Sequence, residues 1–131
     1  MAAEAAVEKG DLERGRTLVN QIRNRAKTMT PVAGTNPDIE LYNSAWTNAA
    51  AARKAVRFER RLELAMEGHR YFDLVRWGNM AAHMNAYIAN EAATITTFGK
   101  GQVFQDKHVR YPIPLSAIDL SGGELVQNPG H

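Results

Sequence analysis

The sequence predicts a mainly α fold of helical hairpins, followed by an irregular, partly extended C-terminal tail. Three observations indicate this fold. Glycines at 10, 68 and 78 separate stretches of helix-forming residues, apolar residues within those stretches recur at helical spacing, and β-branched residues and prolines replace the pattern beyond residue 93. We expect a single domain over 1–131, with a helical hairpin at 1–29, a helical motif region at 44–92 and an extended closing segment at 93–131.

The first hairpin is indicated by the residues at its turn. Residues 1–9 are good helix formers, Gly10 ends their helix, and Asp11 can cap the next one. No capping residue precedes the first turn, so we expect the chain to be a fragment of a longer protein. Apolar residues recur at helical spacing in the second helix at Leu12, Leu18, Val19, Ile22 and Ala26.

A stretch with two prolines and a glycine, 30–44, predicts a loop before the central helix. Ser44 or Asn48 can cap that helix. We expect it to run to about Glu67 and to end at Gly68, in the position where a helix end commonly turns left-handed.

Successive residues of an α-helix are rotated by about 100° about its axis, and this rotation assigns the residues of the central helix to three faces. The predicted apolar stripe is Ala55, Phe58, Leu62, Ala65 and Met66, and the basic side is Arg53, Lys54, Arg57, Arg60 and Arg61. Glu59, Glu63 and Glu67 follow the other flank. Carboxylates at this spacing repel one another by a few tenths of a kcal/mol per pair unless cations approach, and we expect the helix after Gly68 to supply the cations.

Two further helices are predicted, at 69–77 ending at Gly78 and at 79–92. Beyond them, 94–105 has β-branched and aromatic residues around a turn at 99–101, which predicts a short hairpin. Two prolines then favour an extended conformation, with a single helical turn expected at 116–119.

Composition excludes several classes of protein. The 131 residues are 44% hydrophobic, enough for a core, and contain no cysteine, which rules out disulfides, thiolate zinc sites and a cysteine nucleophile. A formal net charge of +2 does not by itself imply a nucleic-acid or membrane partner. The sequence has no long apolar run and no basic, apolar signal peptide at its start.

The candidate catalytic pairs are Glu59 with Glu63, or Glu63 with Asp73, since a glycosidase needs two carboxylates about 5 to 10 Å apart with unequal pKa values. The neighbouring arginines argue against this role, because a general acid needs an apolar environment that raises its pKa. A structural ion-pair network is the favoured interpretation.

No metal or cofactor is expected. A carboxylate-bridged site in a helical bundle needs Glu-x-x-His, and the residue three positions after Glu67 is Arg70. The four histidines are scattered. Tyr42 and Trp46, in or beside a loop, are the aromatic residues that can offer a sugar-stacking surface, although a tryptophan near a helix start is more often packed.

The stretch "ERRLELAMEGHRYFDLVRWG", 59–78, resembles a segment of the SusD/RagB family with the form E-R-R-x-E-L-x-x-E-G-x-R-x-F-D-L-x-R-W-G, and it matches every fixed position. The stretch "AAEAAVEKGDLERGRTLVNQIRNRA" is similar to the family's tetratricopeptide-like hairpin, which ends in N-x-I/V-R-x-R-A. The closing "RYPIPLSAIDL" and "QNPGH" resemble its final segment.

This resemblance implies a nutrient-binding lipoprotein on the surface of the bacterial outer membrane. Such proteins capture oligosaccharides or other nutrients for a TonB-dependent transporter of the SusC type. Their signal peptide and lipidated cysteine are absent from these residues and are expected upstream. The family's ligand contacts lie mostly outside its final helical segment, so the motif residues carry over as structural: Glu59, Arg60, Glu63, Glu67, Arg70, Asp73, Arg76 and Trp77.

We therefore expect non-catalytic nutrient binding, of glycan above all, in which these residues act mainly as scaffold and transporter interface. Tyr42 and Trp46 remain candidates for ligand contact. The alternative is a glycoside hydrolase that uses Glu59 or Glu63.

Overall fold

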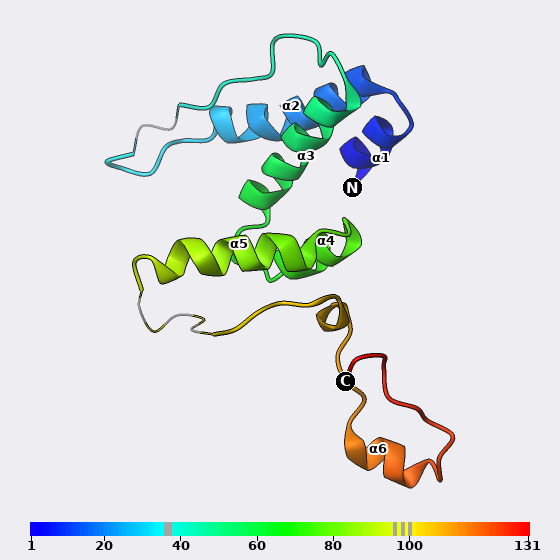
Figure 1. Ribbon diagram of the computed structural model, residues 1–131. Coiled ribbons are helices and arrows are strands. Elements are labelled where there is room, and N and C mark those ends of the chain that lie inside the picture. Colours follow the sequence, from blue (N-terminus) through cyan, green and yellow to red (C-terminus); the bar gives the residue numbers. More distant parts are fainter. Residues whose placement is uncertain (36–37, 96, 98, 100) are drawn as a thin grey trace. The chain divides into compact units, whose positions relative to one another are not determined.

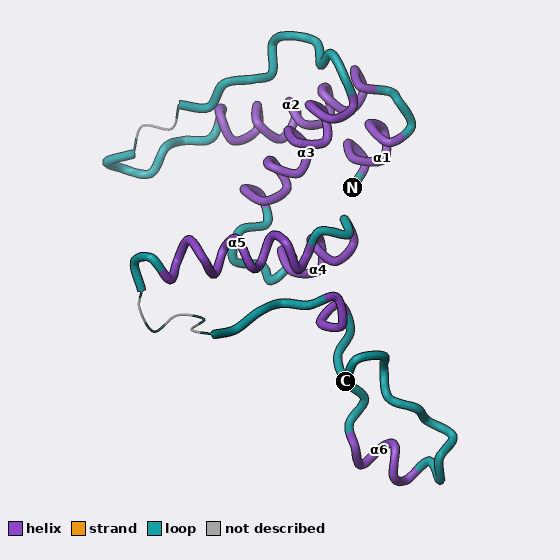
Figure 2. The backbone as a smooth tube through the Cα atoms, in the orientation of Figure 1, coloured by secondary structure: helices purple, strands orange, loops and turns teal. Residues whose placement is uncertain are grey.

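The computed structural model describes residues 1–131 except 36, 37, 96, 98 and 100 (Figure 1). Its described part consists of helices and loops and contains no strand (Figure 2), which confirms the mainly α fold. The chain forms two compact units, 1–66 and 67–131. The elements are α1 (Ala2–Glu8), α2 (Leu12–Thr28), α3 (Ala49–Glu63), α4 (Arg70–Arg76), α5 (Met80–Ala92), the 3-10 helix η1 (Asp106–Val109) and α6 (Leu115–Leu120).

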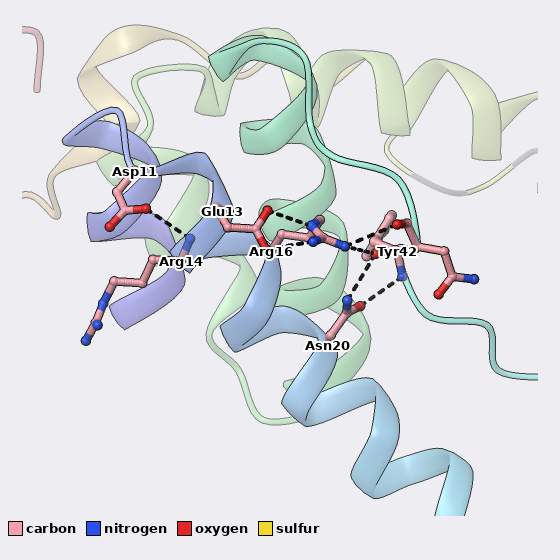
Figure 3. Close-up of polar contacts among 7 residues, drawn as sticks. Asp11, Glu13, Arg14, Arg16, Asn20 and Tyr42 are labelled. Carbon is pink, nitrogen blue, oxygen red and sulfur yellow. Dashed lines mark hydrogen bonds and ion pairs between the residues drawn. The ribbon is translucent and has the colours of Figure 1, made fainter.

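The first unit begins with the predicted hairpin of α1 and α2. Gly10 takes φ +85° between the two helices, a conformation that costs glycine little. The Asp11 side chain accepts a hydrogen bond of 3.0 Å from the backbone N–H of Arg14 (Figure 3), so it caps α2 as predicted. The turn that the sequence indicated is therefore confirmed.

The third helix begins where it was predicted and ends earlier. Asn48 is its cap, because the Asn48 side chain accepts from the N–H of Ala51 at 2.9 Å. The helix stops at Glu63 rather than near Glu67. The N–H of Ala65 bonds to the carbonyl of Leu62, one residue closer than in an α-helix, and Met66 then takes a left-handed φ of 68°, so the chain has left the helix before Gly68.

The core of the first unit is a cluster of small apolar side chains from three helices, with Tyr42 and Trp46 packed against it. On α3 the buried residues are Ala52 and Val56. The fully buried or nearly buried members of the cluster are Val7, Val19, Ala52 and Val56.

The predicted apolar stripe of α3 is not the side that packs. Phe58, Leu62 and Met66 are 49%, 54% and 103% exposed, so this prediction was wrong. The buried side instead continues from Ala52 and Val56 to Glu59, whose side chain is 12% exposed. Small side chains let neighbouring helices approach there, and α2 supplies arginines for the carboxylates, as shown below.

The second unit repeats the pattern of a short helix, a left-handed glycine and a longer helix. Gly78, with φ 72°, separates α4 from α5, as predicted. Leu74 and Met80 are buried at 1% and 2% exposure. The described residues of 94–105 contain no strand, and the hairpin predicted there includes residues 96, 98 and 100, which lie outside the described part.

The closing segment folds back on itself through side-chain contacts. The Gln127 carboxamide accepts from the N–H of Ile113 at 2.8 Å and donates to its carbonyl at 2.9 Å. The single helical turn expected at 116–119 is α6, which follows Pro114. Gln127 thus joins the extended segments on either side of α6.

Gly15 gives a test of how closely α1 and α2 pack. A Cβ at Gly15 would lie 2.6 Å from Val7 Cγ2 and 3.3 Å from the Trp46 ring. Helix propensity alone would make Gly15→Ala stabilising by about 1 kcal/mol, but we expect a loss of about 1 to 3 kcal/mol because the extra methyl overpacks the core. Urea unfolding followed by circular dichroism measures it.

The matched control is Thr17→Ala, at an exposed position of the same helix, where only propensity changes and stability should hold or rise slightly. A Gly15→Ala variant as stable as that control would show that α1 and α2 do not approach this closely.

Candidate functional site

The acidic flank of α3 is paired with arginines of α2. Arg23 bonds to Glu59 and Arg25 bonds to Glu63. Side-chain exposure is 19% and 12% in the first pair, against 60% and 40% in the second. The cations for these two glutamates come from the hairpin before α3, which corrects the expectation that the helix after Gly68 would supply them.

Arg23 joins three segments of the first unit. Its Nε donates to the carbonyl of Glu40, its Nη1 bonds to Glu59, and its guanidinium lies 5.0 Å from the centre of the Tyr42 ring. A cation over an aromatic face is attracted by the ring's quadrupole. One side chain of α2 therefore holds both α3 and the 30–44 loop.

Tyr42 and Trp46, the candidates for sugar stacking, lie in this packed region. Their rings meet edge to face at 5.6 Å, and both pack against the core cluster. Burial and the neighbouring Glu59 carboxylate raise the pKa of Tyr42 above its usual 10.0. With Arg23 over one ring face, the arrangement favours a packing role over an open stacking surface.

The Tyr42 backbone is fixed by Asn20 of α2 (Figure 3). The Asn20 carboxamide donates to the Tyr42 carbonyl at 3.1 Å and accepts from its N–H at 2.8 Å. Arg16 adds a second donor to the Tyr42 carbonyl, at 2.7 Å. The loop before α3 is thus held by side chains of α2.

The second half of the motif forms a separate cluster in the second unit. Arg76 donates to the Asp73 carboxylate at 3.0 Å, and Asp73 is 5% exposed. The guanidinium groups of Arg70 and Arg76 lie 5.5 Å and 5.3 Å from the Trp77 ring. This cluster pairs the buried carboxylate and covers the tryptophan with cations.

Two motif residues have other surroundings. Glu67 lies 3.8 Å from His69, and both side chains are more than half exposed. Arg60 borders an open cavity of about 190 Å³ in the first unit, together with Glu59, Glu63 and apolar residues of α1 and α2. Among the described residues, no group of three or more His, Cys, Asp or Glu side chains is placed to hold a metal ion.

Sequence reasoning missed the partners of the glutamates, although they stand in one of the quoted motifs. The stretch "NQIRNRA" contains Asn20, Arg23 and Arg25, which respectively hold Tyr42, Glu59 and Glu63. Its arginines are two positions apart, and the two glutamates are one helical turn apart. The prediction that the NQIRNRA stretch contacts the segment 59–78 would have identified α2 as the source of the cations.

Comparison with known families settles the relationship of the chain. The sequence model described as the SusD family matches residues 1–131. The chain belongs to the SusD family. No curated protein matches it.

Membership carries a general functional meaning. At that level the family implies glycan binding in nutrient uptake, by generally non-catalytic surface proteins associated with the outer membrane and with SusC-like transporters. Within the described part of this family member, no helix has the length and apolar character to cross a membrane.

The two arginine–glutamate pairs differ in burial, which gives a direct comparison. Arg23→Ala leaves Glu59 at 12% exposure without its cation, and we expect a loss of about 2 to 3 kcal/mol because a buried charge becomes uncompensated. Arg25→Ala breaks the exposed pair and should cost less than about 1 kcal/mol. Urea unfolding of both variants measures the difference.

The double variant Arg23→Ala with Glu59→Gln removes both charges and should recover part of the loss. Equal costs for the two single variants would contradict a buried role for the Arg23–Glu59 pair.

Proposed function

We propose that the chain is the non-catalytic, mainly scaffolding part of a cell-surface receptor for oligosaccharides. The receptor works with a TonB-dependent transporter of the SusC type and stands on the outer membrane through a lipid anchor carried outside these 131 residues. Residues of the motif hold the framework, and part of the surface meets the transporter.

The observation that carries this proposal is the pairing of the motif carboxylates. Glu59, Glu63 and Asp73 each bond to an arginine, namely Arg23, Arg25 and Arg76. Charge-assisted pairs of this kind fix side chains. The first two join α2 to α3, and the third lies within α4. Family membership over the whole chain supplies the class of function to which such a framework contributes.

The same pairing argues for binding without turnover. A glycosidase acid must deliver a proton to the leaving oxygen, whereas Glu59 and Glu63 serve as acceptors for guanidinium groups. A non-catalytic receptor needs affinity and a preformed surface only.

The transporter association can be tested directly. The tagged chain, incubated with detergent-solubilised outer membranes of its native cells, should enrich one TonB-dependent transporter of the SusC type, identified by mass spectrometry. The tag alone, at the same concentration, is the control. Recovery of the transporter at the level of that control would contradict the proposed partnership.

Absence of turnover can be tested on the same preparation. Incubation with a panel of polysaccharides should release no reducing ends above a protein-free blank, because an arginine beside each of Glu59 and Glu63 favours the ionised carboxylate. Release by the unaltered chain that disappears in Glu63→Gln or Glu59→Gln would instead establish the hydrolase alternative.

A further inference from the structure

The second unit contains a cavity of about 320 Å³, within the size range of small-molecule sites. Aromatic and aliphatic side chains make most of its wall, including Tyr111, which is 77% exposed, and Val103, which is 63% exposed. From the motif segment 59–78, Tyr71 of α4 is the one residue among those that line this cavity. It is therefore a feature separate from the ion-paired framework.

Hydrogen bonds fix the α4 and α5 side of this cavity. The Tyr71 hydroxyl donates to the carbonyl of His108. The Asn85 carboxamide donates to the Phe104 carbonyl at 2.9 Å and accepts from its N–H at 2.7 Å. The extended chain that forms the wall is thus attached to α4 and to α5.

The closing segment also holds residues of the lining. His131 Nε2 donates to the carbonyls of Lys107 and Arg110 at 3.0 Å and 3.2 Å. The Asn128 carboxamide donates to the Tyr111 carbonyl at 2.7 Å. A wall held in place before binding loses less entropy when a ligand enters.

These bonds also determine the tautomers of two lining histidines. His108 Nδ1 accepts from the N–H of Gln105 at 3.0 Å, so the proton of the neutral ring is on Nε2. His131 Nε2 faces two carbonyls and must donate, which leaves Nδ1 as an acceptor. The rings lie 6.3 Å apart, and together they offer one donor and one acceptor to a ligand.

The charge of the lining is positive. Arg110 is an exposed lining residue, and in the described part of the chain its guanidinium has no anionic partner. No carboxylate is among the residues that line the cavity. Asp106 lines the neighbouring cavity that Arg110 also borders, without an ion pair between the two. An anionic group would satisfy this arginine by a bidentate contact.

We propose that this cavity binds an acidic sugar, a uronic-acid unit of an oligosaccharide, an inference that takes its glycan class from the proposed function. The sugar's apolar face packs on the ring of Tyr111. Its carboxylate pairs with Arg110, and its hydroxyls meet His108, His131 and the exposed amide of Gln102. Residues 67–131 thereby contribute a ligand site of their own to the receptor.

Calorimetric titration of the 131-residue chain with trigalacturonate tests the site, with the neutral trisaccharide of galactose as the second arm. We expect saturable binding of the acidic sugar at least about tenfold tighter than of the neutral one, because a charge-assisted contact is lost. Arg110→Gln should weaken trigalacturonate binding about tenfold and abolish the preference. Tyr111→Ala should weaken both sugars, and Tyr111→Phe should restore binding.

Controls come from the first unit, which has an exposed arginine and an exposed ring of its own. Arg61→Gln and Phe58→Ala match the two test variants in chemistry and should leave affinity unchanged. Circular dichroism establishes that each variant is folded. Equal affinity for the two trisaccharides would overturn the acidic assignment, and binding unaffected by Arg110→Gln and Tyr111→Ala would overturn the site.

The outcome separates this site from the proposed function. Capture of the transporter together with no trigalacturonate binding would refute the cavity and leave the receptor role standing. Trigalacturonate binding that depends on Arg110, without transporter capture, would establish the site and contradict the proposed association with the transporter.

Discussion

Three side-chain carboxamides form the backbone hydrogen bonds that a neighbouring strand would supply in a β-sheet. An extended segment needs a partner for each buried N–H and C=O, and the described chain has no strand to offer one. A carboxamide carries an NH2 donor group beside an accepting oxygen, so it can bond to both the C=O and the N–H of a single residue. These amide pins are Asn20 on Tyr42, Asn85 on Phe104 and Gln127 on Ile113, with distances of 2.7 to 3.1 Å. The loop before α3, the wall of the acidic-sugar cavity and the closing segment all depend on them.

The two units share one plan, which the first two amide pins reveal. Each has a seven-residue helix, a left-handed glycine and a longer helix that carries the asparagine. In each, the pinned residue is aromatic and its ring meets, edge to face, the ring four positions later. The rings are Tyr42 with Trp46 and Phe104 with His108. Because these pairs differ in residue type, and because the helices differ in length, sequence periodicity did not show the correspondence.

Glycines and capping residues made the turns between helices predictable from the sequence. The buried face of α3 was not predictable in this way. Gly10, Asp11 and Gly78 act locally, so their meaning can be read from neighbouring residues. The face of α3 depends on what approaches it. Hydrophobic periodicity favoured Phe58 and Leu62 as the buried side, but both are exposed, whereas Glu59 is nearly buried beside Arg23 of α2. The cavity of the second unit could not be predicted from the sequence for the same reason. Its lining brings Tyr71 of α4 together with His131, which is distant in the sequence.

The amide pins also restrict which side chains the chain can carry at these places. Aspartate is nearly identical in shape to asparagine, yet an ionised carboxylate has no proton to donate, and its charge would face the carbonyl of Tyr42 or Phe104. One bond would remain and the other would become a repulsion. An aspartate at position 20 or 85 would therefore weaken the attachment of the pinned segment to its helix, although the backbone hydrogen bonds of the helix itself do not involve this side chain.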